Sequence, residues 1–134
     1  MWRLYNPYTG EHFYTADKSE YEFLGTIGWI QEDVAWIAPA EGEEVYRLYN
    51  PFTSDHHYTM NAEERDKLVA LGWNYEGVGW RSASKETGVP LQRLFNPYEI
   101  IGTHHYTTSL EERDQMVENG WVYEGTAWYA VSAE

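Results

Sequence analysis

The sequence predicts an α+β fold in which three ββαβ repeats close about a pseudo-threefold axis. The first observation is a motif that occurs three times, as RLYNPYTGEHFYT, RLYNPFTSDHHYT and RLFNPYEIIGTHHYT. The second is a pair of Trp residues, seven positions apart, in the second half of each copy: Trp29 and Trp36, Trp73 and Trp80, Trp121 and Trp128. Constant spacing in three copies indicates one structural unit used three times, so we place the repeats at residues 1–42, 43–88 and 89–134 of a single domain.

A β-hairpin is expected at the start of each repeat. The alternating run Arg-Leu-Tyr/Phe-Asn, a proline and a short polar turn lead into a second run that ends in Tyr-Thr. We expect Tyr5 to pair with Tyr14, which leaves Pro7 at a strand end where its missing N–H does no harm. The third copy has two additional residues in its turn, and turns that tolerate such changes point outward.

A helix is expected after each hairpin. Asp17, Asn61 and Ser109 each precede a Glu by three residues, which is the spacing of a capping box at a helix start. A glycine then occupies the place of a left-handed C-terminal cap in every copy: Gly28, Gly72 and Gly120. Each repeat should therefore contain roughly ten residues of helix.

The segments WIQEDVAW, WNYEGVGW and WVYEGTAW predict a strand after each helix, because they are rich in aromatic and β-branched residues. Two Trp residues seven apart would face opposite sides of a regular strand. We therefore expect Gly77 and Gly125 to allow a bulge that returns both Trp side chains of a pair to one side.

One ββαβ unit cannot cover its own apolar face, so the three units must pack together. The copies are near-identical and no distinct capping unit is present. Closure into a ring, as in a trefoil or a very small propeller, would leave no terminal repeat with an uncovered apolar face. A linear stack of the three units is the alternative.

The composition is that of a packed globular protein with an acidic surface. The formal net charge is −13, and nine Lys and Arg residues are too few to neutralise phosphate backbones or anionic membranes, so we expect neither nucleic acid nor membrane as a partner. The chain has no Cys, which excludes disulfides and thiolate metal sites. No apolar run reaches the ~18 residues of a membrane span. Met1 directly precedes the first repeat, so we expect a monomeric module excised from a longer protein, in which it is fused to a catalytic or surface domain.

The six paired Trp residues are expected in the core, because residues kept at the same place in units that pack on each other are usually buried. Arg65 and Arg113 lie on the inward face of the predicted helices, where a guanidinium needs a partner. We expect Glu76 and Glu124 to be those partners and the pairs to be structural. Repeat one has Tyr21 and Asp33 at the positions of Arg and Gly, so its local network should differ.

All five histidines lie in the second strand of the hairpins: His12, His56 and His104, with His57 and His105 beside them. Three equivalent histidines could converge on a threefold axis as a zinc site. No HExxH or Cys/His spacing supports that reading, so we expect hydrogen-bonding histidines on a strand surface, no metal and no cofactor.

An aromatic residue follows each Asn-Pro, at the start of the outward turn: Tyr8, Phe52 and Tyr98. Exposed planar rings stack on the apolar faces of sugars, while neighbouring polar side chains supply directional hydrogen bonds. The alternative is that each ring folds back over its own hairpin.

Catalysis finds little support in the sequence. Hydrolysis of a glycan requires one unequal pair of carboxyl groups, whereas threefold repetition supplies the same environment three times. No GxSxG and no phosphate-binding glycine loop are present. We therefore expect no enzymatic activity.

The segment YRLYNPFTSDHHYT…AEERDKLVALGWNYEGVGW, residues 46–80, resembles a repeat family of unknown function found in secreted and surface proteins of Gram-positive bacteria. Members of that family are often appended to peptidoglycan hydrolases such as lysozymes and amidases. The resemblance covers nearly the whole chain in three copies and implies an extracellular, non-catalytic accessory module. This chain departs from the family in carrying an aromatic residue after Asn-Pro, where a polar residue is common.

Together these observations predict a secreted or cell-surface module that binds bacterial cell-wall glycan or another polysaccharide. Three similar weak sites would gain avidity on a polymer, which presents the same epitope many times. Each site would combine the turn with the neighbouring strand, and the residues expected to bind are Tyr8, His12, Phe52, His56, Tyr98 and His104. The acidic charge favours a neutral glycan over phosphate-bearing polymers. The alternative is a structural spacer or a protein-interaction domain that binds no glycan.

Overall fold

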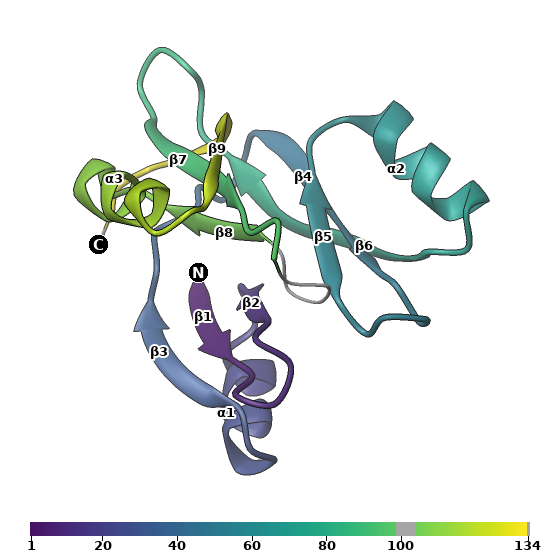
Figure 1. Cartoon of the computed structure of the whole chain (residues 1–134). Coiled ribbons are helices and arrows are strands. Elements are labelled where there is room, and N and C mark those ends of the chain that lie inside the picture. The colour runs from purple at the N-terminus through teal and green to yellow at the C-terminus, as the bar shows by residue number, and fades with distance from the viewer. Residues whose placement is uncertain (99–103, 134) are drawn as a thin grey trace.

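The structure, a computed structural model, describes residues 1–98 and 104–133 and contains three copies of one ββαβ unit (Figure 1). Repeat one consists of β1 (Trp2–Tyr5), β2 (His12–Thr15), α1 (Lys18–Thr26) and β3 (Ile30–Val34). Repeat two consists of β4 (Glu43–Tyr49), β5 (His56–Thr59), α2 (Ala62–Ala70) and β6 (Asn74–Ser82). Repeat three consists of β7 (Val89–Phe95), β8 (His104–Thr107), α3 (Leu110–Glu118) and β9 (Val122–Ala130).

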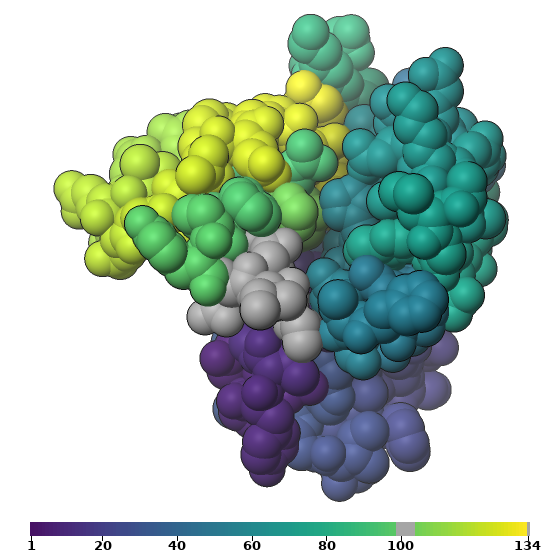
Figure 2. Space-filling view, turned by 45° about the vertical axis from the view of Figure 1, so that its right-hand side comes forward, coloured from purple at the N-terminus to yellow at the C-terminus, as the bar shows by residue number. Residues whose placement is uncertain are grey.

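The strands of each repeat form their own antiparallel sheet, with the first strand in the middle: β2-β1-β3, β5-β4-β6 and β8-β7-β9. The predicted α+β repeat is therefore confirmed. In Figure 1 repeat one lies below, repeat two to the right and repeat three at the upper left. The space-filling view shows the same three sectors on one face of the molecule (Figure 2).

The hairpin register differs from the expected one by two residues. Tyr5 pairs with His12 and Arg3 with Tyr14, so the expected pairing of Tyr5 with Tyr14 is wrong. The cause is the residue before the proline: the Asn6 side chain accepts the N–H of Tyr8 at 2.9 Å, and the Asn6 N–H donates to the carbonyl of Glu11 at 2.9 Å. This Asx turn closes the loop immediately after Asn6. The longer turn of repeat three falls mainly on residues 99–103, outside the described residues.

The helix boundaries follow the predicted caps. The side chains of Asp17, Asn61 and Ser109 accept N–H groups of the first turn, and each helix is nine residues long. The N–H groups of these cap residues donate at 3.0 Å to the hydroxyls of Thr15, Thr59 and Thr107. Because these Thr hydroxyls take the bond that the Glu of a capping box would make, the carboxylates of Glu20, Glu64 and Glu112 reach other partners. None of the three helices in the described part of the chain is long and apolar enough to cross a membrane.

The bulges in the third strands are also confirmed. The ladders of the last two repeats shift register between the first and third strands, and Gly77 and Gly125 have φ angles of 96° and 94°. The two Trp residues of a pair nevertheless do not share a side, and the expectation that all six lie in the core is wrong, because Trp29, Trp73 and Trp121 are only half-buried. Trp29 packs on Phe13 (5.9 Å between ring centroids), whereas Trp36 packs on Tyr14 (5.3 Å), which points to the opposite face of β2. The first Trp precedes its strand, so the helix-ending glycine, at φ 110° in the case of Gly28, sets its direction instead of strand alternation.

The core is a cluster of six aromatic rings to which every repeat contributes one Tyr and one Trp. The ring centroids of Tyr14, Tyr58 and Tyr106 lie 5.5–5.9 Å from one another. Those of Trp36, Trp80 and Trp128 lie 5.2–5.9 Å apart, and all six residues are at most 5% exposed. The N–H of Tyr14 donates to the Tyr58 hydroxyl (3.2 Å), and the N–H of Tyr106 donates to the Tyr14 hydroxyl (3.1 Å). The three repeats thus share one core.

Removing one ring of this cluster should destabilise the whole domain. We expect Trp80→Ala to lower the free energy of unfolding by about 3–5 kcal/mol, because it leaves a cavity between rings of all three repeats. Urea unfolding followed by far-UV circular dichroism measures the change. Phe52→Ala is the control, since Phe52 is 81% exposed, and it should change stability by no more than about 0.5 kcal/mol. A loss at Trp80 as small as that of the control would contradict a shared core.

Candidate functional site

The aromatic residues after Asn-Pro stand on the surface at the turn tips. Tyr8 is 87% exposed, Phe52 81% and Tyr98 82%. In each turn the side-chain oxygen of the preceding Asn accepts the N–H of the aromatic residue, at 2.9, 2.9 and 3.0 Å. Of the two alternatives left open by the sequence, exposed rings and rings folded back over their own hairpins, the structure shows exposed rings. We call Tyr8, Phe52 and Tyr98 the tip rings.

Each tip ring rests against the glycine that ends the helix of its own repeat. A Cβ atom added to Gly28, Gly72 or Gly120 would lie 3.6, 3.1 or 3.3 Å from Cε2 of the corresponding ring. The glycine therefore has two functions: it adopts a positive φ, and it leaves room for the edge of the ring. The rings lean on their own repeat, but one edge contact leaves more than four fifths of each residue accessible.

The histidines equivalent to His12 do not stand beside the tip rings. They lie at the boundaries between repeats, which we call seams: His56 bonds Glu11 of repeat one, His12 contacts His105 of repeat three, and His104 contacts His57 of repeat two. His12, His56 and His104 pack against aromatic residues of the first strands, with ring centroids 5.0, 5.0 and 5.4 Å from those of Tyr5, Tyr49 and Phe95. The expected sites that combine a tip ring with this histidine are therefore split into two places.

Every repeat contains an Arg–Glu–His cluster that joins its three strands. Glu32 contacts Arg3 (2.9 Å) and His12 (3.5 Å). Glu76 contacts Arg47 (3.0 Å) and His56 (3.4 Å), and Glu124 contacts Arg93 (3.2 Å) and His104 (3.0 Å). Repeat one keeps this cluster although Asp33 replaces the glycine, and Asp33 adopts the same left-handed backbone at φ 72°.

These contacts correct the expected pairing of Arg65 and Arg113 with Glu76 and Glu124. Arg65 instead bonds Asp66 (3.0 Å) and lies over the rings of Tyr46 (4.5 Å) and Tyr75 (5.4 Å). Arg113 likewise bonds Asp114 and lies 4.9 Å from the centroid of the Tyr123 ring. The first-strand arginines already hold the two glutamates, so the helix arginines stack on aromatic rings of the sheet. Both arginines thus contact partners within their own repeat, other than the expected glutamates.

The other two histidines bond the helix glutamates that the capping pattern leaves available. His57 contacts Glu64 and His105 contacts Glu112, both at 2.6 Å. The rings of His57 and His104 meet at 5.4 Å and those of His105 and His12 at 4.8 Å, across two different seams. Over residues 1–98 and 104–133, no three His, Cys, Asp or Glu side chains form a group that could hold a metal ion.

The histidines of the three clusters differ in charge. Burial lowers the pKa of His12 to about 3, and the nearby His105 and Arg3 act in the same direction. Burial and the nearby His57 also lower the pKa of His104. Burial opposes the charge of His56 too, but hydrogen bonds to Glu11 and Glu76 outweigh it and raise the pKa of His56 to about 9. Near neutral pH, His56 is therefore charged and His12 is not.

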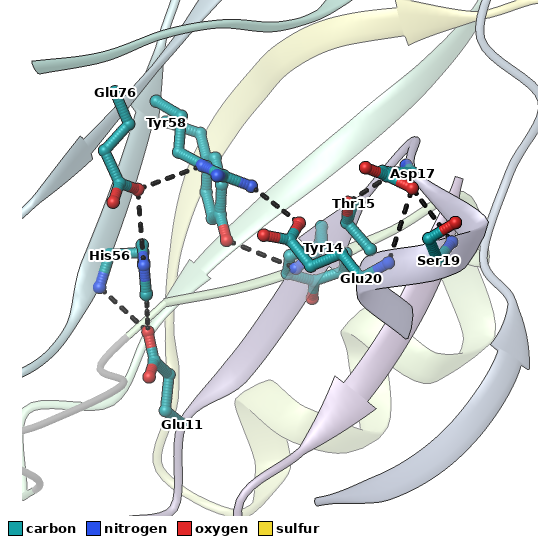
Figure 3. A network of polar contacts seen from close by, with 10 residues as sticks. Glu11, Tyr14, Thr15, Asp17, Ser19, Glu20, His56, Tyr58 and Glu76 are labelled. Carbon is teal, nitrogen blue, oxygen red and sulfur yellow. Dashed lines mark hydrogen bonds and ion pairs between the residues drawn. The ribbon is translucent and has the colours of Figure 1, made fainter. Parts of the chain in front are cut away.

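The seam between repeats one and two is largely filled, and Glu11 of repeat one bonds His56 of repeat two across it (Figure 3). Glu11 is 2% exposed and accepts both the backbone N–H and the ring Nδ1–H of His56, each at 2.8 Å. Phe13 packs on the ring of His56 (4.6 Å) and under the guanidinium of Arg47 (5.1 Å). Arg47 also bonds Glu20 at 3.1 Å. A smaller cleft, of about 200 Å³, remains beside the start of α1.

The seam between repeats two and three is open. It holds a cleft of about 420 Å³ with His57, Glu64 and Trp73 on one side and Arg93, His104 and Glu124 on the other. Asp55, His56 and Leu68 complete its lining. Of these residues, sequence reasoning proposed a ligand-binding role only for His56 and His104. A sequence difference between the copies could have indicated this cleft: repeat two has Asp55 and His57 where repeat one has Glu11 and Phe13.

These features define a class of protein: a three-repeat α+β domain with exposed aromatic turns and ionic seams. The chain belongs to the family described as a domain of unknown function (DUF5648), whose profile matches residues 1–131. No curated protein and no solved structure gives a significant match to the chain.

The opposite shifts of two histidines predict a stability maximum near pH 6.5. The pKa of His56 is raised, so the stability that it contributes is present below its unfolded value of about 6.5 and is lost as pH rises through about 9. This loss is of the order of 3 kcal/mol. The pKa of His12 is lowered, so its effect is the reverse: stability is kept above about 6.5 and falls as pH drops toward 3.

Urea unfolding at several pH values between 4 and 9.5 checks both slopes. His56→Gln should flatten the slope between pH 6.5 and 9, whereas His12→Gln should reduce the acid slope and leave the alkaline slope. Equal slopes in wild type and His56→Gln between pH 6.5 and 9 would show that this histidine is not held charged.

Proposed function

We propose that this chain is a non-catalytic module that binds a neutral glycan, above all the glycan of a bacterial cell wall, through its three tip rings. The observation that carries the proposal is the exposure of Tyr8, Phe52 and Tyr98, each above 80%, at equivalent places of the three repeats. Large aromatic residues bury most of their area in ordinary folds. Three that stay exposed at one repeated position, each with a fixed backbone turn, fit a surface that stacks on sugar rings.

The proposal includes closure of the repeats about a pseudo-threefold axis. In a linear stack the first and third repeats would not meet. The Tyr14 and Tyr106 rings, whose centroids lie 5.5 Å apart, and a β-bridge between Ile37 and Ser132 both join these repeats and support closure. A closed core holds the tip rings at fixed positions relative to one another. Weak sites on one rigid body gain avidity on a polymer.

Charge supports a neutral ligand. The formal net charge of −13 repels phosphate-bearing polymers. Tip rings offer an apolar face and no cation of their own, so they suit sugar faces better than anionic groups. A nucleic acid or an anionic membrane is disfavoured for the same reason.

The carboxyl groups at the seams do not suit glycan hydrolysis. A glycosidase needs a general acid whose pKa is raised, next to a second carboxylate in a different environment. Glu76 is instead held ionised, because the hydrogen bond from His56 lowers its pKa against the effect of burial. Equivalent clusters recur in all three repeats. The proposal is therefore binding without catalysis.

The resemblance of residues 46–80 to repeats of Gram-positive surface proteins supports a secreted or cell-surface location. In such a setting the module, as a monomer, would hold a fused catalytic or surface domain to its polymeric substrate. The competing function is a spacer or a protein-interaction domain, in which repetition serves folding alone.

Sedimentation with purified Gram-positive cell walls tests the proposal. We expect wild type to sediment and the triple variant Tyr8→Ala, Phe52→Ala and Tyr98→Ala to lose at least about 100-fold in apparent affinity, because avidity disappears with the sites. Each single variant should lose only several-fold. Phe23→Ala is the control, since Phe23 is also an exposed ring (62%) but belongs to α1 and not to a turn, and it should bind like wild type.

Two results would contradict the proposal. If wild type sediments with no wall or insoluble polysaccharide, the spacer function is favoured. If the triple variant binds as well as wild type, the tip rings are not the binding surface. Release of reducing ends from peptidoglycan by the purified domain would refute the absence of catalysis.

A further inference from the structure

We propose that the seam between repeats two and three forms a specific pocket for a single sugar unit or disaccharide of the glycan, and that the seam between repeats one and two does not bind alike. This inference rests on the proposed function and assigns its specificity to one place. The pocket is the cleft of about 420 Å³ whose apolar wall is Trp73 and Leu68. Its volume lies within the range of roughly 300–1,000 Å³ found for small-molecule sites.

The cleft is open because two side chains of repeat two are smaller than their counterparts in repeat one. Glu11 reaches across the first seam to His56 at 2.8 Å, whereas Asp55, one methylene shorter, accepts the hydroxyl of Thr53 in its own turn. Phe13 fills the first seam under Arg47. Its counterpart His57 turns to Glu64 instead, with 2.6 Å between the two groups.

The polar wall of the cleft consists of paired charges. Glu124 bonds Arg93 at 3.2 Å and His104 at 3.0 Å, and Glu64 bonds His57. Such pairs present hydrogen-bond donors and acceptors side by side. Sugar hydroxyls, which donate and accept at once, match both kinds of group.

Other ligand classes match the cleft less well. A phosphate group would face the carboxylates of Asp55, Glu64 and Glu124. A cation would face Arg93 and the charged ring of His56. A neutral polyol with one apolar face avoids both repulsions and can lie on Trp73, as sugars do on aromatic side chains.

Two residues that line the cleft, Asp55 and Trp73, are close in sequence to the tip ring of repeat two or to the glycine that it contacts. Phe52 rests on Gly72, and Trp73 is the next residue. Asp55 belongs to the same turn as Phe52, and its carbonyl accepts the N–H of Asn50 at 2.9 Å. A polymer that stacks on Phe52 can therefore place a neighbouring unit in the cleft. The same path is closed in repeat one by Glu11 and Phe13.

The first copy provides the design of a variant that closes the pocket. The double variant Asp55→Glu and His57→Phe gives the second seam the residues of the first. We expect it to weaken binding of triacetylchitotriose and of soluble glycan fragments released from cell walls by muramidase by at least 10-fold, measured by titration calorimetry. The tip rings remain in this variant, so it should still sediment with walls, only less strongly than wild type.

Two further measurements control for folding. Melting temperature and circular dichroism of the double variant should match wild type. In NMR titrations of wild type with the same probes, the indole N–H signal of Trp73, assigned with Trp73→Phe, should shift more than that of Trp29, its equivalent at the filled seam. This comparison is made on the wild-type protein, so it does not depend on how well the double variant folds.

The inference and the proposed function fail separately. If wild type sediments with walls but binds neither soluble probe, or if the double variant binds both as wild type does, the pocket is refuted and the tip rings stand. Equal shifts of the Trp73 and Trp29 signals would refute a single pocket in the same way. If wild type sediments with no glycan, the proposed function itself is refuted, and the pocket with it.

Discussion

The structure depends on the contact of six aromatic rings at its centre. Each repeat supplies one Tyr and one Trp, and no repeat can bury its own pair without the other two. Large aromatic side chains bury more apolar area than most others, so burial of these six contributes strongly to stability. Because Tyr14, Tyr58 and Tyr106 point into this cluster, the residues before them in each second strand must point elsewhere, toward the seams. The contacts of His57 with Glu64 and of His105 with Glu112 are thus a consequence of the core.

Much of the fold could be predicted because its signals are local. Caps at Asp17, Asn61 and Ser109 and left-handed glycines such as Gly72 depend only on neighbouring residues. The sequence predictions failed where a side chain has more than one possible partner far away in the sequence. Glu76 could bond Arg47 or Arg65, and only the sheet order, with β4 beside β6, decides for Arg47. The hairpin register failed for another reason, since the Asx turn at Asn6 closes the loop earlier than strand alternation suggests.

Threefold repetition of the core does not impose threefold repetition of the surface. The position before the core Tyr is Phe13 in the first copy and His57 and His105 in the others, and this single difference changes what the helix glutamate bonds. The charge state of the cluster histidines also differs, because Glu11 lies beside His56 alone. A buried charge is stable only when it is paired, so Glu11 and His56 depend on each other. Repeats can diverge at the seams while the six rings keep them together.

The tip rings are exposed and yet held in place, which suits the weak, repeated binding proposed for them. Phe52 has its backbone fixed by Asn50 and its ring edge against Gly72, whose successor Trp73 packs with its ring centroid 6.3 Å from that of His57. Ordering a free side chain on binding costs about 0.5–1.5 kcal/mol, a large part of the affinity of a single sugar contact. A ring that is already ordered avoids most of that cost. The glycine that ends each helix therefore has a role in both the fold and the surface. It ends the helix that packs on the sheet, and it contacts the edge of the exposed tip ring.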